Sequence, residues 1–178
     1  MSECSSLPTI AIGVLTSLCA TGIYALFLLK CRPSIKISPY IAKMKSEDGY
    51  IFLLKFRNTS KWFKVIDIDC EMHLSSINTG SGGTITKLKA IELKKSYFFE
   101  IPKYDKTDDG SKYAIQVGCT SDLSRDLSEN DTHFLTLKIK ARNGFSGFTS
   151  VFKERFNTPN IRVGEHGLGI NDEVISIS

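Results

Sequence analysis

The sequence has few of the residue patterns that carry catalysis or zinc binding. Its three histidines, His73, His133 and His166, are far apart, and no His-x-x-x-His or Cys-x-x-Cys pair occurs. Zinc sites usually need such close spacings. The Gly-x-Ser-x-Gly sequence that marks the nucleophile of α/β-hydrolases is also absent. We therefore expect a protein that is not an enzyme and needs no metal or other cofactor.

Cysteines are few and odd in number: Cys4, Cys19, Cys31, Cys70 and Cys119. An odd count does not indicate a disulfide framework. Cys70 and Cys119 fall in apolar strand patterns, so we expect buried, reduced thiols. A disulfide between these two residues would instead indicate that the domain faces an oxidising compartment.

Charge is missing from one long segment near the N-terminus. Residues 7–29 contain no charged side chain. As a helix they would extend about 34 Å, which is enough to cross a hydrocarbon core of about 30 Å. The alternative, a cleaved signal peptide, would have a basic start and a shorter apolar run. With a mean hydropathy of −0.06 for the whole chain, we predict a single transmembrane anchor over residues 1–32.

Basic residues are absent before this segment and frequent after it. The only charge before it is Glu3, whereas five cations follow before the next acid: Lys30, Arg32, Lys36, Lys43 and Lys45. An excess of basic residues marks the cytoplasmic flank. We therefore predict a single-pass membrane protein whose soluble domain faces the cytoplasm. The same five residues could also attract anionic lipid headgroups; the alternative is that they only set the topology.

Small residues recur every four positions along the apolar segment, at Gly13, Ser17, Thr21 and Ala25. Residues four apart share one helix face, and small side chains let two helices approach closely in lipid. This stripe predicts a packing face for a second copy or for a partner helix. The alternative is that membrane helices are rich in small residues in any case.

After Pro33 the pattern changes to short alternating runs that are broken by turn residues. Alternation predicts strands, and the absence of a helical period predicts an all-β domain. We expect an antiparallel, immunoglobulin-like β-sandwich over residues 33–157. The tail, residues 158–178, either adds a strand near residues 173–177 or is loose. The predicted strands cover residues 34–44, 50–58, 65–74, 84–91, 97–101, 113–120, 133–143 and 145–156.

The strand at residues 65–74 has the clearest alternation. We predict a buried face formed by Ile66, Ile68, Cys70, Met72 and Leu74, and a solvated face formed by Asp67, Asp69, Glu71 and His73. The acidic stripe could suggest a metal site. However, neighbours on one face of a strand are about 6.6 Å apart, so one ion would reach at most two of them. A solvated face is therefore the preferred interpretation.

Glycine and asparagine predict two turns. Residues 78–83, Asn-Thr-Gly-Ser-Gly-Gly, predict a flexible loop, and Asn143-Gly144 predicts a two-residue hairpin turn with positive φ angles. Gly147 would then mark a bulge in the returning strand. The glycine-rich loop is not expected to bind phosphate, because a strand rather than a helix follows it.

Two runs carry a resemblance to a group of proteins. One is Leu54-Lys55-Phe56-Arg57-Asn58-Thr59-Ser60 with the alternating residues 65–70, and the other is Gly144-Phe145-Ser146-Gly147-Phe148 with Val151-Phe152. The chain resembles uncharacterised small single-pass membrane proteins that carry an Ig-like β-sandwich domain. This resemblance implies the architecture and no activity.

These observations predict a membrane-anchored, non-enzymatic module that binds a protein partner at the cytoplasmic membrane surface. The alternative is an oligomerising membrane effector or channel-like subunit whose β domain senses a ligand. The expected partners are the lipid bilayer and either a protein or a second copy that packs through the transmembrane helix. Nucleic acid is not expected, because the lysines at positions 87, 89, 94 and 95 lack interleaved aromatic residues.

Overall fold

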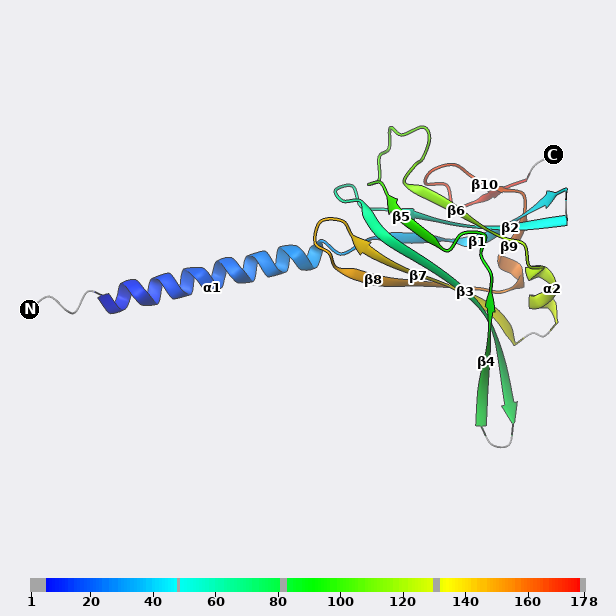
Figure 1. Cartoon of the computed structure of the whole chain (residues 1–178), viewed down its shortest axis with the longest axis horizontal. Helices are drawn as coiled ribbons and strands as arrows, with labels where there is room; N and C mark the ends of the chain where they lie inside the picture. The colour runs from blue at the N-terminus through cyan, green and yellow to red at the C-terminus, as the bar shows by residue number, and fades with distance from the viewer. Residues whose placement is uncertain (1–5, 48, 81–82, 130–131, 177–178) are drawn as a thin grey trace, which may run out of the picture.

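A long N-terminal helix leads into a β domain. The computed structural model describes residues 6–47, 49–80, 83–129 and 132–176. The helix, α1 (Ser6–Lys30), projects from one end of the domain (Figure 1). Its segment Ile10–Lys30 is long and apolar enough to cross a membrane, and none of its most apolar stretch is buried against the rest of the chain. The prediction of one apolar N-terminal helix is confirmed.

The first sheet contains the strands that follow the helix. Its order is β6-β2-β1-β9, with antiparallel neighbours except for β9, which runs parallel to β1. The register of β1 against β2 shifts between Ile37 and Ile41, around Pro39, because proline has no N–H to donate to the ladder. The strands are β1 (Ile35–Ser46), β2 (Gly49–Asn58), β6 (Ala114–Cys119) and β9 (Ile161–Val163).

The second sheet is fully antiparallel and has the order β4-β3-β7-β8, with β5 also paired to β3. Its strands are β3 (Val65–Gly80), β4 (Gly83–Ile91), β5 (Tyr97–Ile101), β7 (His133–Asn143) and β8 (Thr149–Phe156). Both sheets contribute to one apolar core. Phe52 and Phe56 of the first sheet, and Ile68 and Leu137 of the second, are almost completely buried in it. The prediction of a β-dominated domain of mainly antiparallel sheets behind one N-terminal apolar helix is confirmed.

A bulge in β3 changes which residues face the core. Asp67 has a positive φ of 49°, and the register of β3 against β7 shifts between Ile66 and Asp69. Consequently Val65 and Ile68 are both buried, whereas Ile66 is partly exposed. The predicted placement of Ile66 on the buried face is wrong, because strict alternation fails where an extra residue enters the strand.

The turn between β7 and β8 is longer than predicted. It spans residues 144–148, and the side-chain oxygen of Asn143 accepts hydrogen bonds from the backbone N–H groups of Phe145 (2.8 Å) and Ser146 (3.0 Å). Gly147, with φ 73°, closes the turn by donating its N–H to the carbonyl of Asn143. The prediction of a two-residue turn at Asn143-Gly144 is therefore wrong. Gly147 belongs to the turn rather than to a bulge in β8.

Two further segments differ from the sequence prediction. The predicted loop at residues 78–83 is largely strand, because β3 continues to Gly80 and β4 begins at Gly83; residues 81–82 lie outside the described residues. A short helix, α2 (Leu123–Ser128), was not predicted. The Asp122 side chain caps it by accepting the N–H of Arg125. Six residues are too few to show a helical period.

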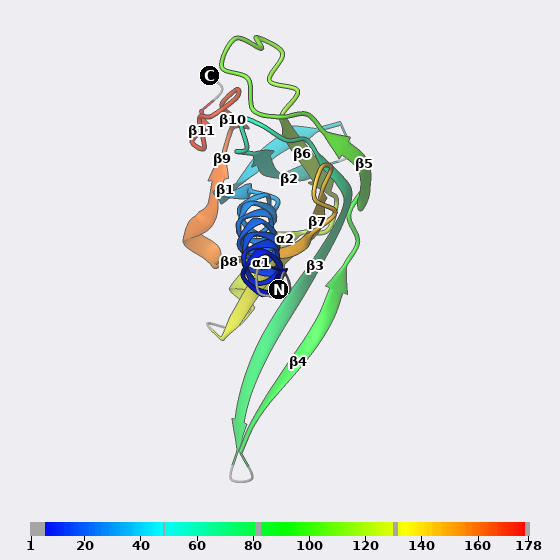
Figure 2. The ribbon, with the colours of Figure 1, turned by 90° about the vertical axis from the view of Figure 1, so that its left-hand side faces the viewer.

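The C-terminal tail packs along the first sheet. It forms a short 3-10 helix, η1 (Thr158–Asn160), then β9, and then a two-stranded pair of β10 (Glu165–His166) and β11 (Val174–Ile175). Figure 2 shows these elements beside β1, on the side of the domain away from β5. The strand β11 falls inside the segment 173–177 where the sequence suggested one.

Candidate interaction surface

The small-residue stripe lies on α1 with its side chains exposed. The hydroxyl of Thr21 donates to the carbonyl of Ser17 at 2.8 Å, within the same helix. A Cβ at Gly13 would meet no described atom within 4 Å apart from the backbone of its own helix and its chain neighbours, so that face is open. Ala25 is exposed on the next turn. Packing of these residues against a second helix stays a prediction.

The five basic residues after the helix are not brought together. Lys30 and Arg32 lie at the end of α1, but β1 carries the other three away from it, with about 30 Å between Lys36 and Lys45 at the usual rise of a strand. Lys36 pairs with Asp172, with 2.7 Å between Nζ and Oδ2. Their shared contact with a membrane surface stays a prediction, and β1 ends on the side of the domain opposite α1 (Figure 1).

The last two of these residues sit near the far end of β1. Lys43 donates to the Ser124 hydroxyl at 3.2 Å and lies over the ring of Tyr50. Lys45 is exposed. Lys43 therefore contacts α2, and Lys45 lies opposite Tyr50 near the β1–β2 turn.

The acidic stripe of β3 is engaged in surface pairs. Asp67 pairs with Arg142 at 3.1 Å and accepts a hydrogen bond from the hydroxyl of Tyr97. Glu71 pairs with Lys138 at 3.1 Å, and this contact holds the pKa of Glu71 below its usual range. Among the described residues, no group of three histidine, cysteine or acidic side chains is placed to hold a metal ion.

The two thiols of the domain are free and buried. Burial, with a smaller contribution from Asp69, raises the pKa of Cys70 to about 12. Burial also raises the pKa of Cys119. Both side chains are therefore protonated and poorly nucleophilic near neutral pH, which makes them packing residues rather than reactive groups.

The most prominent surface feature is the β3–β4 hairpin. β7 accompanies β3 only as far as Ser76, which pairs with His133. Beyond that point β4 is the only strand paired with β3 in the described part of the chain, from Ile77 opposite Thr86 to Gly80 opposite Gly83. The hairpin therefore extends past the sheet as a two-stranded ribbon, well clear of the rest of the domain (Figures 1 and 2).

The strand β4 presents apolar side chains to solvent. Residues 83–90 are all exposed, with Ile85 at 66% and Leu88 at 68%. On the outer face of the sheet Leu88, Ser75 and Phe134 lie in one cross-strand row. Ser75 is only 3% exposed. We call Leu88, Ser75 and Phe134, together with Arg155 over the ring of Phe134 at 3.4 Å, the hairpin patch.

The outer edge of β4, next to the hairpin patch, is the second part of the candidate interaction surface. Within the described residues no strand pairs with it, so it offers unpaired backbone groups to another chain. Its charged side chains are both basic: Lys87 is exposed, and Lys89 lies 3.6 Å from Asp126 of α2. An edge with this charge suits an acidic, extended segment.

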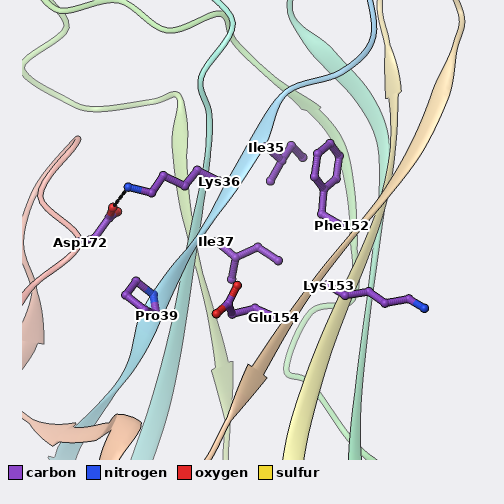
Figure 3. A pocket seen from close by; sticks show the side chains of 8 residues that line it. All are labelled: Ile35, Lys36, Ile37, Pro39, Phe152, Lys153, Glu154 and Asp172. Carbon is purple, nitrogen blue, oxygen red and sulfur yellow. Dashed lines mark ion pairs between the residues drawn. The ribbon is translucent and has the colours of Figure 1, made fainter.

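A shallow groove lies where β1 and β8 meet (Figure 3). It encloses about 400 Å³, and its apolar floor is formed by Ile35, Ile37 and Phe152. Figure 3 shows Lys36 reaching away from the floor to Asp172, and Lys153 pointing away on the other side. The polar groups therefore do not converge on one point, and the groove has no arrangement suited to catalysis.

A polar cluster under the tail is the remaining candidate. The Lys55 ammonium donates to the carbonyls of Gly167 and Asn171, and the ring of His166 contacts the carbonyl of Leu53 at 2.9 Å. Burial lowers the pKa of Lys55 and that of His166. Because these contacts join β2 to the tail, the cluster stabilises the packing of the tail and is not an open site.

No family model matches the chain, and no curated protein sequence matches it. The functional inference therefore depends on the geometry described above. Leu88 and Phe134 were not predicted as surface residues from the sequence. The alternating pattern of β4 indicated a strand, but only the sheet order shows that none of the described strands pairs with its outer edge.

Proposed function

We propose that the protein is a membrane-anchored, non-enzymatic β-sandwich module that holds a protein partner at the cytoplasmic membrane surface. The observation that carries this proposal is the protruding β3–β4 hairpin, with Ile85 and Leu88 exposed beside an unpaired edge. The antiparallel sheets around one core favour the finer description as an Ig-like domain. The basic residues after α1 favour the cytoplasmic side.

A bound partner segment would stabilise the β3–β4 hairpin. An isolated two-stranded ribbon is only marginally stable in water. Burying a leucine side chain such as Leu88 contributes about 1.5–3 kcal/mol. A strand added to the outer edge of β4 would pair the backbone groups of that edge and would lie beside Leu88, the member of the hairpin patch that β4 carries. We infer that the partner supplies an extended segment whose acidic side chains meet Lys87 and whose apolar side chains meet Leu88.

Site-specific crosslinking in membranes tests this proposal. A photoreactive amino acid replaces Leu88 in the full chain, and in a matched control it replaces Leu168 of the tail, which is at least as exposed. We expect a discrete crosslinked product from position 88 that Lys87→Glu greatly reduces, and none from position 168. Equal products from both positions, or no effect of the charge reversal, would contradict binding at the β4 edge.

Sidedness is tested separately with a membrane-impermeant maleimide on intact cells. A cysteine replaces the exposed Asp109 in a Cys4→Ser background, so that the N-terminal thiol does not react. Labelling only after the membrane is permeabilised supports a cytoplasmic domain. Labelling of intact cells would place the domain on the other side.

The open face of α1 supports a second candidate, an oligomerising membrane effector or channel-like subunit. Gly13 has free space around it, and the stripe that contains Ser17 is exposed. If this face mediates assembly, Gly13→Leu with Ser17→Leu should reduce the particle size in mild detergent. An unchanged size would leave the partner-binding module as the better proposal.

A further inference from the structure

The domain is attached firmly at the end of the helix. Only residues 31–34 separate α1 from β1, and two loops flank this junction (Figure 1). The hydroxyl of Ser146 donates to the carbonyl of Cys31 at 2.6 Å. The hydroxyls of Ser34 and Thr59 lie 2.6 Å apart. The loops at residues 59–64 and 144–148 are therefore held beside the last turn of α1.

Aromatic side chains gather on these two loops. Phe145 stacks on Phe63 with 5.0 Å between the ring centroids and meets the ring of Phe27 edge-on at 6.2 Å. Trp62 is 82% exposed, Phe145 58% and Phe148 37%. We call the two loops the aromatic end of the domain. Such an exposed group of large apolar side chains is unusual on a freely solvated surface.

The charged residues of the junction and the two loops all have the same sign. The junction and the two loops, residues 27–34, 59–64 and 144–148, contain four basic residues and no acidic one. Lys64 pairs with Glu100 of β5 at 2.7 Å, so it is partly neutralised. Lys30, Arg32 and Lys61 are exposed. Aromatic rings with flanking cations are the composition that favours the boundary between headgroups and acyl chains.

The contact with the helix sets the depth of the aromatic end. Phe27 lies three residues before Lys30, about 4.5 Å along the helix axis. A ring packed against Phe27 is therefore level with the last apolar turn of α1 and not beyond it. If α1 crosses a bilayer, Phe145 has to lie within the leaflet boundary.

We propose that the aromatic end inserts Trp62, Phe145 and Phe148 into the interface of the leaflet that α1 leaves, while Lys30, Arg32 and Lys61 contact anionic headgroups. This inference rests on the membrane anchorage in the proposed function. It assigns lipid contact to the loops beside the helix rather than to the basic residues along β1. The inserted rings fix the orientation of the domain, so that the β3–β4 hairpin is held across the helix axis (Figure 1).

Trp62 is the only tryptophan in the chain, so its fluorescence tests the inference directly. The full-length protein is reconstituted in vesicles of phosphatidylcholine and phosphatidylserine. We expect strong quenching of Trp62 by lipids brominated near the headgroup end of the acyl chain, and weak quenching by aqueous acrylamide. Efficient acrylamide quenching without quenching by brominated lipid overturns the inference.

A matched pair of variants supplies the control. Phe145→Ser should increase the acrylamide quenching of Trp62, because it removes the ring that anchors the neighbouring loop. Leu168→Ser, at an equally apolar exposed position in the tail, should leave the quenching unchanged. Equal effects of the two variants would overturn the inference.

Two further outcomes separate this inference from the proposed function. Protein that does not float with the vesicles overturns membrane anchorage, and the proposed function with it. Protein that floats but leaves Trp62 open to acrylamide overturns only the inserted aromatic end. If Trp62 is protected from acrylamide but loses this protection when the protein is diluted in excess lipid, the aromatic end contacts a second copy of the chain. That result would overturn the assignment to lipid.

Discussion

Arg57 in β2 and Asp172 in the tail form an ion pair in which the guanidinium Nη1 lies 2.6 Å from Oδ1. The other carboxylate oxygen of Asp172 lies 2.7 Å from the Lys36 ammonium. Arg57 also donates to the carbonyl of Ile170. One carboxylate thus joins the tail to two neighbouring strands of the first sheet.

Asp172→Asn should loosen this connection. The change keeps the shape of the side chain but removes its charge, and it leaves Arg57 without a counter-ion. We expect a loss of about 2 kcal/mol in the free energy of unfolding. Chemical denaturation of the full-length protein in detergent measures the loss, and limited proteolysis should cut the tail faster. Asp109→Asn, at an exposed site, is the control and should change neither.

Acid should destabilise the domain through His166. Burial lowers its pKa in the folded protein below the usual 6.5. Below pH 6.5 the unfolded chain therefore binds more protons at this position than the folded protein does. The stabilisation is present above pH 6.5 and is lost as the pH falls towards the folded pKa. Melting temperatures across this range should decline, and His166→Gln should flatten the decline; a variant that keeps the full slope contradicts this role.

The bulge in β3 leads us to predict how substitutions of Asp67 change stability. Asp67→Gly and Asp67→Ala both remove the pair with Arg142, but only glycine adopts the φ of 49° without strain. We expect the alanine variant to be less stable than the glycine variant by about 1 kcal/mol. Denaturant titration of both variants measures the difference. Equal stability would argue against a left-handed conformation at this residue.

The two faces of β3 should respond differently to truncation. Ile68 is fully buried and Asp69 is exposed, although they are adjacent. Ile68→Ala should cost about 2–5 kcal/mol. Asp69→Ala should cost less than about 0.5 kcal/mol, as is usual for a solvated side chain. Similar losses in the two variants would refute the assignment of the faces.

Hydrogen exchange should show that the hairpin is the least protected part of the sheet. Beyond Ser76 the ribbon has only two strands, so its amides open without disturbing the core. We expect fast exchange at Ile85 and slow exchange at Leu137, measured by mass spectrometry or NMR. A bound partner should slow exchange in β4 selectively. Slow exchange throughout the unbound hairpin would contradict a marginally stable ribbon.

The sequence predicts where the strands of this fold lie better than it predicts which strands are neighbours in a sheet. The predicted bounds of β7 and β5 match the structure to the residue, and in β7 alternation is the reason, because every second side chain from Leu135 to Asn143 is buried. Alternation fails at Ile66, where an inserted residue changes the face, and at Asn143-Gly144, where side-chain hydrogen bonds stabilise a longer turn. Alternation describes a single strand and contains no information about bulges or turn length.

The candidate surface was harder to predict for a related reason. The exposure of Leu88 follows from the position of β4 at the sheet edge, which depends on pairing between distant segments. Trp62 and Phe145 are far apart in the sequence, and only the folded junction brings their loops to the end of α1. Local patterns give the chemistry of these residues but not their placement.

The short junction at residues 31–34 also has a kinetic consequence. If α1 anchors the protein in a bilayer as proposed, the protein diffuses only in the plane of that bilayer, and so few connecting residues keep its hairpin at a nearly constant height above the plane. Encounters with a partner in the same membrane then become a two-dimensional search within a thin layer. The effective concentration of the two proposed binding surfaces would rise accordingly, so that a modest contact at one strand edge would be enough for lasting association.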